Sequence, residues 1–120
     1  MPPAGHRHER VAEEIRHEVS AMIAGELKDP RISGLVTVTG VRVTPDLRRA
    51  QIFVSVLGQE SDSASTMAGL QAAAGFMRRE IGSRLHLWRS PELFFVLDDS
   101  GAYGDHIERL LRQSRKPPAE

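Results

Sequence analysis

The stretch from residue 67 to residue 87 has the spacing of a helix with a break in its middle. Apolar residues recur there every three or four positions, which places them on one face of a helix and gives that face something to bury. They are Leu70, Ala73, Ala74, Met77 and Ile81. Gly75 interrupts the pattern, and a straight helix would leave Phe76 off the apolar face. The sequence therefore predicts a kink at residues 73–75 that turns Phe76 inward.

Positive charge follows the predicted kink. Arg78, Arg79, Arg84 and Arg89 stand there against Glu80 alone, a local charge of +3 in a chain whose formal net charge is zero. A bend of small residues followed by cations is suited to the phosphate backbone of a nucleic acid. The alternative is a tolerated glycine, at a cost of about 1 kcal/mol relative to alanine, beside a solvated arginine face.

Length and composition indicate one globular domain. The chain has 120 residues, of which 40% are apolar and 27% charged, and it contains no cysteine. Disulfides, thiolate catalysis and cysteine-ligated zinc are therefore excluded. No apolar run is long enough for a signal peptide or for the roughly 18 residues of a membrane helix. We expect a cytoplasmic protein that contacts no membrane.

The first helix is predicted from Arg7 to Leu27, after a flexible tail at residues 1–6. The opposite side of this helix mixes arginine with glutamate, but its N-terminal end is basic through Arg7 and Arg10. Asp29-Pro30 ends the helix, because the residue before a proline is disfavoured in the helical conformation. Its apolar face consists of Val11, Ile15, Val19, Met22, Ile23 and Leu27.

Two alternating stretches predict an antiparallel hairpin. In residues 35–44 the valines occupy even positions before Thr39-Gly40 and odd positions after it. Such a change predicts one inserted residue, a β-bulge, at that point. A turn at residues 44–47 leads into a second strand from Arg49 to Leu57. Arg48 and Arg49 therefore lie at the hairpin tip.

The rest of the chain is predicted to add the broken helix, one strand and one further helix. Asp62 or Ser63 is expected to cap the broken helix. A third strand, apolar on both faces, is expected from Glu92 to Leu97. A C-terminal helix is expected within residues 100–115, and residues 116–120 are expected to be a disordered tail.

This order of elements predicts an α+β fold, with three strands and helices on one face in residues 7–99. It is the order of the type II K-homology domain, an RNA-binding module whose Gly-x-x-Gly loop between two helices clamps the nucleotide backbone. Residues 73–76 contain only one glycine. The Gly-x-x-Gly at residues 101–104 follows the third strand, where we expect an ordinary turn.

Several short motifs occur in a fixed order along the chain. They are Lys28-Asp29-Pro30-Arg31, Thr39-Gly40-Val41, Asp46-Leu47, Leu70-Gln71, Ala73-Ala74-Gly75-Phe76 with Arg78, and Pro91-Glu92-Leu93. Together, from about residue 7 to residue 100, the chain resembles the bacterial ribosome-binding factor A family. The resemblance implies that an Ala-x-Gly kink, here Ala73-Ala74-Gly75, replaces the usual K-homology loop.

The resemblance also implies a role in maturation of the small ribosomal subunit, without catalysis. It implies binding to the immature 30S particle near the 5′ end of 16S rRNA, around the decoding region, and an association with growth in the cold. The resemblance implies as well that a ribosome-associated GTPase helps to release the protein from the subunit in some bacteria. We therefore expect a monomeric partner of the 30S subunit that supports late rRNA processing and needs no cofactor.

The predicted RNA-binding surface combines the kink with arginines. Residues 31–89 hold eight basic and four acidic side chains, a local charge of +4. Aromatic residues make up only 5% of the chain. We therefore expect the protein to recognise the shape and the backbone of the RNA and not to stack its bases on aromatic side chains. The predicted contacts are Ala73, Ala74, Gly75, Arg78, Arg79, Arg84, Arg89, Arg48, Arg49, Arg7 and Arg10.

Two other functions stay open at this point. An enzyme has little support, because the adjacent carboxylates Asp98 and Asp99 would point to opposite faces of a strand, and no nucleophile motif or metal-ligand cluster is present. We predict no catalytic residue and no metal site. The second alternative is a protein-protein adaptor that docks through the open sheet face or the C-terminal helix without contacting RNA. Affinity measured against salt separates an RNA contact from such an adaptor.

Overall fold

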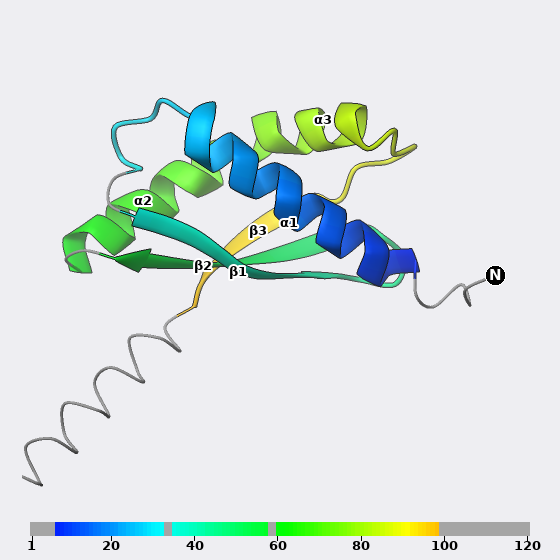
Figure 1. Ribbon diagram of the computed structural model, residues 1–120, viewed down its shortest axis with the longest axis horizontal. Helices are drawn as coiled ribbons and strands as arrows, with labels where there is room; N and C mark the ends of the chain where they lie inside the picture. Colours follow the sequence, from blue (N-terminus) through cyan, green and yellow to red (C-terminus); the bar gives the residue numbers. More distant parts are fainter. Residues whose placement is uncertain (1–6, 33–34, 58–59, 99–120) are drawn as a thin grey trace, which may run out of the picture.

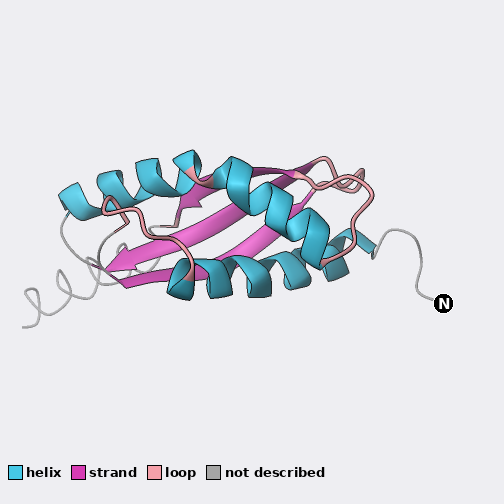
Figure 2. Cartoon of the chain, turned by 90° about the horizontal axis from the view of Figure 1, so that it is seen from above, coloured by secondary structure: helices cyan, strands magenta, loops and turns pink. Residues whose placement is uncertain are grey.

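Three helices lie over one face of a three-stranded sheet in the computed structural model, which describes residues 7–32, 35–57 and 60–98 (Figures 1 and 2). The elements are α1 (Arg7–Gly25), β1 (Leu35–Val43), β2 (Arg49–Leu57), α2 (Glu60–Ala72), α3 (Ala74–Arg84) and β3 (Glu92–Leu97). The predicted α+β order is confirmed. The two expected tails, the C-terminal helix and the Gly-x-x-Gly at residues 101–104 lie outside the described residues. None of the described helices is long and apolar enough to cross a membrane.

The strand β2 lies at the centre of the sheet, between β1 and β3. β1 pairs with β2 antiparallel, from Leu35 opposite Leu57 to Val43 opposite Ala50. β3 pairs with β2 in parallel, and Arg49 lies beside Glu92 at its start. A parallel pair needs a crossover, which α2 and α3 supply. The predicted hairpin and the predicted third strand are confirmed.

A β-bulge interrupts β1, as the change of valine parity predicted. The register shifts between Val38 and Gly40, which leaves Thr39 as the extra residue. Because of this insertion, Val38 and Val43 both face the core, with 6% and 2% of their surface exposed. The bulge also re-aims Thr39, whose hydroxyl donates a hydrogen bond to Asp98 Oδ2 at 2.6 Å, beyond the end of β3.

α1 buries one face against the sheet. Val11, Ile15, Val19 and Met22 recur at helical spacing and are buried. The helix ends at Gly25, two residues before its predicted end. The last turn is closed because the N–H groups of the next two residues, 26 and 27, both donate to the carbonyl of Met22, at 2.8 and 3.1 Å.

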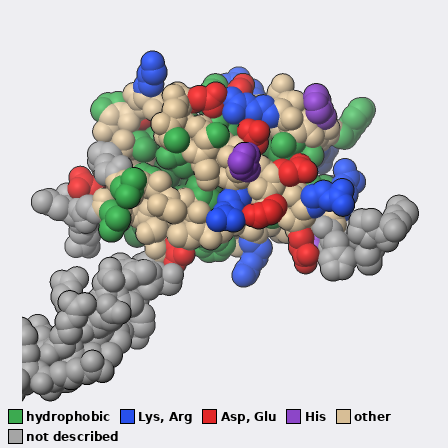
Figure 3. Space-filling model, viewed as in Figure 1, with side chains coloured by type: hydrophobic (Ala, Val, Ile, Leu, Met, Phe, Trp, Pro, Cys, Tyr) green, Lys and Arg blue, Asp and Glu red, His purple; other side chains and the backbone are tan. Residues whose placement is uncertain are grey.

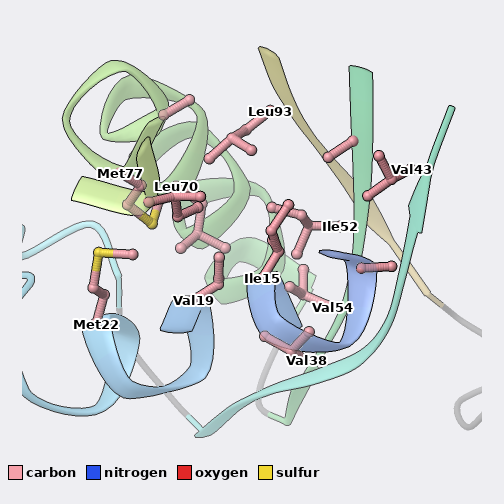
Figure 4. Close-up of a cluster of buried hydrophobic side chains, with 14 of the residues drawn as sticks. Ile15, Val19, Met22, Val38, Val43, Ile52, Val54, Leu70, Met77 and Leu93 are labelled. Carbon is pink, nitrogen blue, oxygen red and sulfur yellow. The ribbon is translucent and has the colours of Figure 1, made fainter. Parts of the chain in front are cut away.

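The core lies between the helices and the face of β2 that carries Ala50, Ile52 and Val54, all with no exposed surface. In Figure 4 the side chains of α1, among them Ile15, Val19 and Met22, lie in one cluster with those of Ile52 in β2 and of Leu70 and Met77 in the kinked helix pair. Burying an aliphatic side chain of this size contributes about 1.5–3 kcal/mol. This core holds the kinked pair against the sheet.

The opposite face of the sheet, here called the outer face, is not covered by a described helix (Figure 1). Arg42 on β1 lies opposite Gln51 on β2, which in turn lies beside Phe94 on β3. Phe53 and Phe94 are half-buried, and Arg42 and Gln51 are exposed. The outer face therefore combines aromatic rings with a cation.

α2 begins at Glu60, so the prediction that Asp62 or Ser63 caps it is wrong. Both residues lie in the first turn of the helix. Carboxylates in a first turn interact favourably with the positive end of the helix dipole. Asp62 therefore favours a helix that starts before it, earlier than the capping pattern suggested.

The loop after α1 is docked on α2. Ser65 Oγ donates to the backbone carbonyl of Arg31 at 3.0 Å. An ideal Cβ on Gly69 would lie 2.8 Å from Ile32 Cγ1 and 3.2 Å from Arg31 Cβ, so only glycine allows the loop to approach so closely. Arg31 itself is held by Asp29, whose Oδ2 lies 2.6 Å from Arg31 Nη2.

The side chain of Gln71 in α2 pairs with the free edge of β3. Its Nε2 donates to Leu93 O at 3.2 Å, and its Oε1 accepts from Phe95 N at 3.1 Å. An amide group with one donor and one acceptor matches the hydrogen-bonding pattern of a neighbouring strand. Part of the β3 edge is therefore occupied by α2.

Candidate nucleic-acid interface

A single residue, Ala73, separates α2 from α3. Its N–H donates to the carbonyls of Gly69 and Leu70, both at 3.1 Å, and its own carbonyl accepts from Met77 N at 3.0 Å. With φ at −85° and ψ at −3°, Ala73 departs from the ψ of an α-helix, so the second helix takes a new direction. The predicted break at this point is confirmed.

The N-terminus of α3 has no capping side chain. Ala73 occupies the N-cap position without a side-chain hydrogen bond, and the first turn contains no acidic residue. The first N–H groups of a helix have no intrahelical acceptor, and the helix dipole places partial positive charge beside them. An ideal Cβ on Gly75 would meet nothing within 4 Å, so the backbone is open to close approach. This arrangement suits a phosphate oxygen.

Phe76 is 41% exposed, so the prediction that the kink turns it inward is wrong. Ala74, Met77 and Ile81 fill the inward positions of α3. One residue corresponds to about 100° around a helix, which directs Phe76 away from Met77. Phe76 instead stands next to Gly75 in the exposed part of α3.

Arg79 lies four residues after Gly75, on the same side of α3, and is exposed. Among the residues that the structure describes, no carboxylate forms an ion pair with it. Its guanidinium is therefore available to an external anion. Gly75, Phe76 and Arg79 form the surface here called the kink patch.

Arg84 is engaged by carboxylates of the protein itself. Its Nη2 lies 2.6 Å from Glu26 Oε1 and 3.1 Å from Glu80 Oε1, and its Nη1 lies 3.5 Å from Glu18 Oε2. These contacts, chiefly the hydrogen bond that Arg84 donates to Glu26, raise the pKa of Arg84 further above its already high ordinary value. Arg84 joins α3 to α1, and the structure does not bring it to the kink patch. Its contact with phosphate stays a prediction.

Arg78 lies on a different side of α3 from Arg79 and contacts the loop that leads to β3. Its Nε donates to Ser90 O at 3.1 Å, and Ser90 Oγ donates back to Arg78 O at 2.7 Å. This pair of bonds fixes the position of Ser90. Arg89, the preceding residue, is exposed.

The hairpin tip and the start of β3 lie at the same end of the sheet, because Glu92 N donates to Arg48 O at 2.9 Å. Arg48 is exposed, and its Nε lies 4.0 Å from Asp46 Oδ2. The guanidinium carbon of Arg49 lies 5.8 Å from the centroid of the Phe94 ring, within the range of a cation–π contact. Arg48, Arg49 and Arg89 therefore gather at this end, here called the hairpin end.

The N-terminal turns of α1 approach the same hairpin. A groove of about 990 Å³ has His8 and Ala12 on one side and Thr44 and Pro45 in its lining. Arg7 and Arg10 belong to these turns and are exposed. The structure thus divides the exposed arginines of the predicted set between the kink patch (Arg79), the hairpin end (Arg48, Arg49 and Arg89) and the start of α1 (Arg7 and Arg10). Figure 3 shows basic side chains interspersed with acidic ones on the face turned to the viewer.

One residue of the hairpin end was missed by sequence reasoning. Trp88, next to Arg89, is completely exposed, at 102% of its reference area. A signal was present, because the only tryptophan of the chain stands directly before Arg89-Ser90-Pro91, where the proline predicts a loop. The described residues contain no group of three or more His, Cys, Asp or Glu side chains that could hold a metal ion.

The family model for ribosome-binding factor A matches residues 7–111 of the chain. The chain belongs to the ribosome-binding factor A family. It is 57% identical to ribosome-binding factor A of Anaeromyxobacter dehalogenans strain 2CP-C, over 91% of this chain and 79% of that protein.

Solved structures of the ribosome-binding factor A family share the fold. The solution structure of a Thermotoga maritima protein assigned to ribosome-binding factor A matches with a TM-score of 0.67 and 33% identity, over 80% of this chain and 90% of that one. A Thermus thermophilus ribosome-binding factor A homology model, fitted into a cryo-electron microscopy map of a 30S complex, matches with a TM-score of 0.57 and 23% identity, over 80% of this chain and 96% of that one. The resemblance to this family and the K-homology-like fold are thereby confirmed.

Proposed function

We propose that this protein binds free or immature 30S subunits through 16S rRNA, near its 5′ end and the decoding region, and supports late rRNA processing, including during growth in the cold. Membership of the ribosome-binding factor A family carries the proposal. The Thermus thermophilus relative was fitted into the map of a 30S complex, which supports the choice of subunit.

The kink patch is the primary contact in this proposal. A backbone phosphate approaches Gly75, where no side chain obstructs it, and accepts hydrogen bonds from N–H groups at the start of α3. Arg79, one turn later, neutralises the same or the next phosphate. Contacts of this kind position RNA without reading its sequence.

The hairpin end provides a second contact. Arg48, Arg49 and Arg89 extend positive charge away from the kink patch, and Arg7 and Arg10 flank it. The protein then acts by occupying a surface of the subunit, without a catalytic step or cofactor. It works as a monomer in the cytoplasm, and a ribosome-associated GTPase assists its release.

Co-sedimentation with free 30S subunits, 50S subunits and assembled ribosomes tests this function. We expect selective binding to free 30S subunits. Replacing both Arg79 and Arg89 with glutamine should weaken that binding about 10-fold or more, because two charge-assisted hydrogen bonds are lost. Lys28→Gln, at an exposed position in the loop after α1, is the matched control and should bind normally.

Salt dependence distinguishes RNA binding from the adaptor alternative. Contacts with phosphates release counterions, so affinity should fall steeply as salt rises. The adaptor alternative draws on the outer face, where Phe53 and Phe94 are only half-buried and Leu57 is 63% exposed. A flat salt dependence, or equal binding to 30S and 50S subunits, would contradict the proposed function.

A further inference from the structure

Trp88 is the single tryptophan of the chain, and its side chain lies entirely in solvent. Isolated exposed apolar side chains are common and need no special explanation. Trp88 differs because the residues on both sides of it are held in place. A large rigid ring on a fixed loop can contact a partner at little cost in conformational entropy.

The end of α3 fixes the loop before Trp88. Leu87 N donates to Gly82 O at 3.0 Å and His86 N donates to Ser83 O at 3.4 Å, the two hydrogen bonds of a Schellman motif. His86 takes the left-handed conformation that this motif requires, with φ at 53°. Leu87 packs against the core. The chain is therefore anchored one residue before Trp88.

The loop after Trp88 is equally constrained. Ser90 exchanges two hydrogen bonds with Arg78, Pro91 is buried, and Glu92 N donates to Arg48 O. An ideal Cβ on Gly82 would lie 3.2 Å from Ser90 Cβ, so the loop packs closely on α3. Only Trp88 and Arg89 project between these anchors.

The charge around Trp88 indicates an anionic partner. Arg89 is adjacent in the chain, and Arg48 lies at the same end of the sheet. Two acidic residues, Asp46 and Glu92, are also present, and Asp46 faces Arg48. An indole face stacks well on a nucleobase, and a neighbouring guanidinium can take the flanking phosphate.

We propose that Trp88 stacks on an unpaired nucleobase of the bound rRNA while Arg89 contacts the adjacent phosphate. This inference rests on the proposed function and deepens it, because it adds an unstacked base to a surface otherwise suited to the RNA backbone. Stacked bases were not expected from the low aromatic content of the sequence. A base that is paired within a duplex cannot make this contact.

The first measurement compares the binding of variants to 30S subunits by co-sedimentation. Trp88→Ala should weaken binding roughly 5- to 100-fold, the usual effect of losing one base-aromatic stack. Trp88→Phe should retain part of the affinity because it keeps a ring. Leu57→Ala removes an exposed apolar side chain at the other end of the sheet and should have no effect. Equal binding by wild type and Trp88→Ala would overturn the inference.

The slope of affinity against salt separates stacking from charge. Trp88→Ala should leave the slope unchanged, because no counterion is released by a neutral ring. Arg89→Gln should reduce the slope of log K against log salt by about 0.7 to 0.9. A lowered slope in Trp88→Ala would mean that the loop has merely been displaced, which contradicts stacking.

Protein-free 16S rRNA identifies the chemical class of the partner. Because Trp88 is the only tryptophan, selectively excited tryptophan fluorescence reports on this side chain and not on the one tyrosine. We expect quenching when rRNA is added, and the same loss of affinity in Trp88→Ala. A loss seen with 30S subunits but not with protein-free rRNA would assign Trp88 to a ribosomal protein and overturn the inference. If wild-type protein does not bind 30S subunits at all, the proposed function itself is wrong.

Discussion

Thr39 and Asp98 are joined across the central strand of the sheet. The Thr39 hydroxyl donates to Asp98 Oδ2 at 2.6 Å, although the two residues are 59 positions apart. The contact depends on the bulge in β1, because Thr39 is the inserted residue. It links the first strand to the end of the last one, with β2 between them.

Thr39→Val should lower the free energy of unfolding by about 1 kcal/mol, because it keeps the β-branched shape and loses one hydrogen bond to a charged group at an exposed site. Urea unfolding followed by circular dichroism measures the change. Thr37→Val, on the same strand and also exposed, is the matched control and should have little effect. Equal stability of the Thr39 variant and the wild type would show that the bond contributes nothing.

Gly75→Ala should separate stability from RNA binding. A methyl group at Gly75 meets no neighbour, and alanine favours a helix over glycine, so the variant should be more stable by about 0.5–1 kcal/mol. The same methyl group would obstruct a phosphate at the kink, so affinity for 30S subunits should fall. Unchanged affinity would remove Gly75 from the interface.

Gly69→Ala makes the matched comparison in the preceding helix. Its methyl group would lie 2.8 Å from Ile32 Cγ1, so the docked loop must shift. We expect a loss of about 1–3 kcal/mol from overpacking, partly offset by helix propensity. Thermal unfolding of the two glycine variants should therefore move in opposite directions.

Arg79 and Arg84 are expected to respond differently to replacement by glutamine. Arg84→Gln removes the link from α3 to Glu18 and Glu26, so it should lower the melting temperature. Arg79→Gln should leave the melting temperature unchanged and reduce the salt dependence of 30S binding. If Arg84→Gln instead reduced the salt dependence of 30S binding, Arg84 would have to leave its carboxylate partners Glu18 and Glu26 to bind RNA.

The stability of the protein should depend on pH through Asp29. Hydrogen bonds from Arg31 lower the pKa of Asp29 below its ordinary value of 3.8. A carboxyl with a lowered pKa stabilises the fold fully above the ordinary value, and the contribution is lost as the pH falls through the lowered pKa. Asp29→Asn should therefore be less stable than wild type at pH 7, and the difference should narrow below about pH 4.

Urea midpoints of wild type and Asp29→Asn at several pH values between 7 and 2.5 provide the measurement. Because Asp29 and Arg31 are in contact with solvent, 1 M NaCl should reduce the difference at pH 7. A difference that stays constant down to pH 2.5 would rule out ionisation of Asp29 as its cause.

Local pattern was sufficient to predict the strands, the bulge and the helix break. The alternation of apolar and polar residues along β2 determines which of its side chains face the core. In β1 the valines switch from even to odd positions at Thr39, which required an inserted residue. The break between α2 and α3 followed from small residues and a glycine within one helix. These features depend on residues that are close together in the chain.

The surroundings of individual side chains could not be predicted in the same way. Arg84 meets Glu26, which is 58 residues away on another element, and charge spacing along α3 contains no information about it. The orientation of Phe76 depends on how α3 rotates after Ala73. The exposure of Trp88 depends on loop anchors at Gly82 and Ser90 that form only in the folded state.

The side-chain amide of Gln71 in α2 makes the hydrogen bonds that one residue of a fourth strand would make with β3. An unprotected strand edge is a template on which another copy of a chain can add a strand, and such pairing leads to aggregation. Gln71 occupies the acceptor of Leu93 and the donor of Phe95 at the middle of β3. The sheet can therefore stay only three strands wide. The Gln71 side chain hinders edge-to-edge association of one copy of the protein with another.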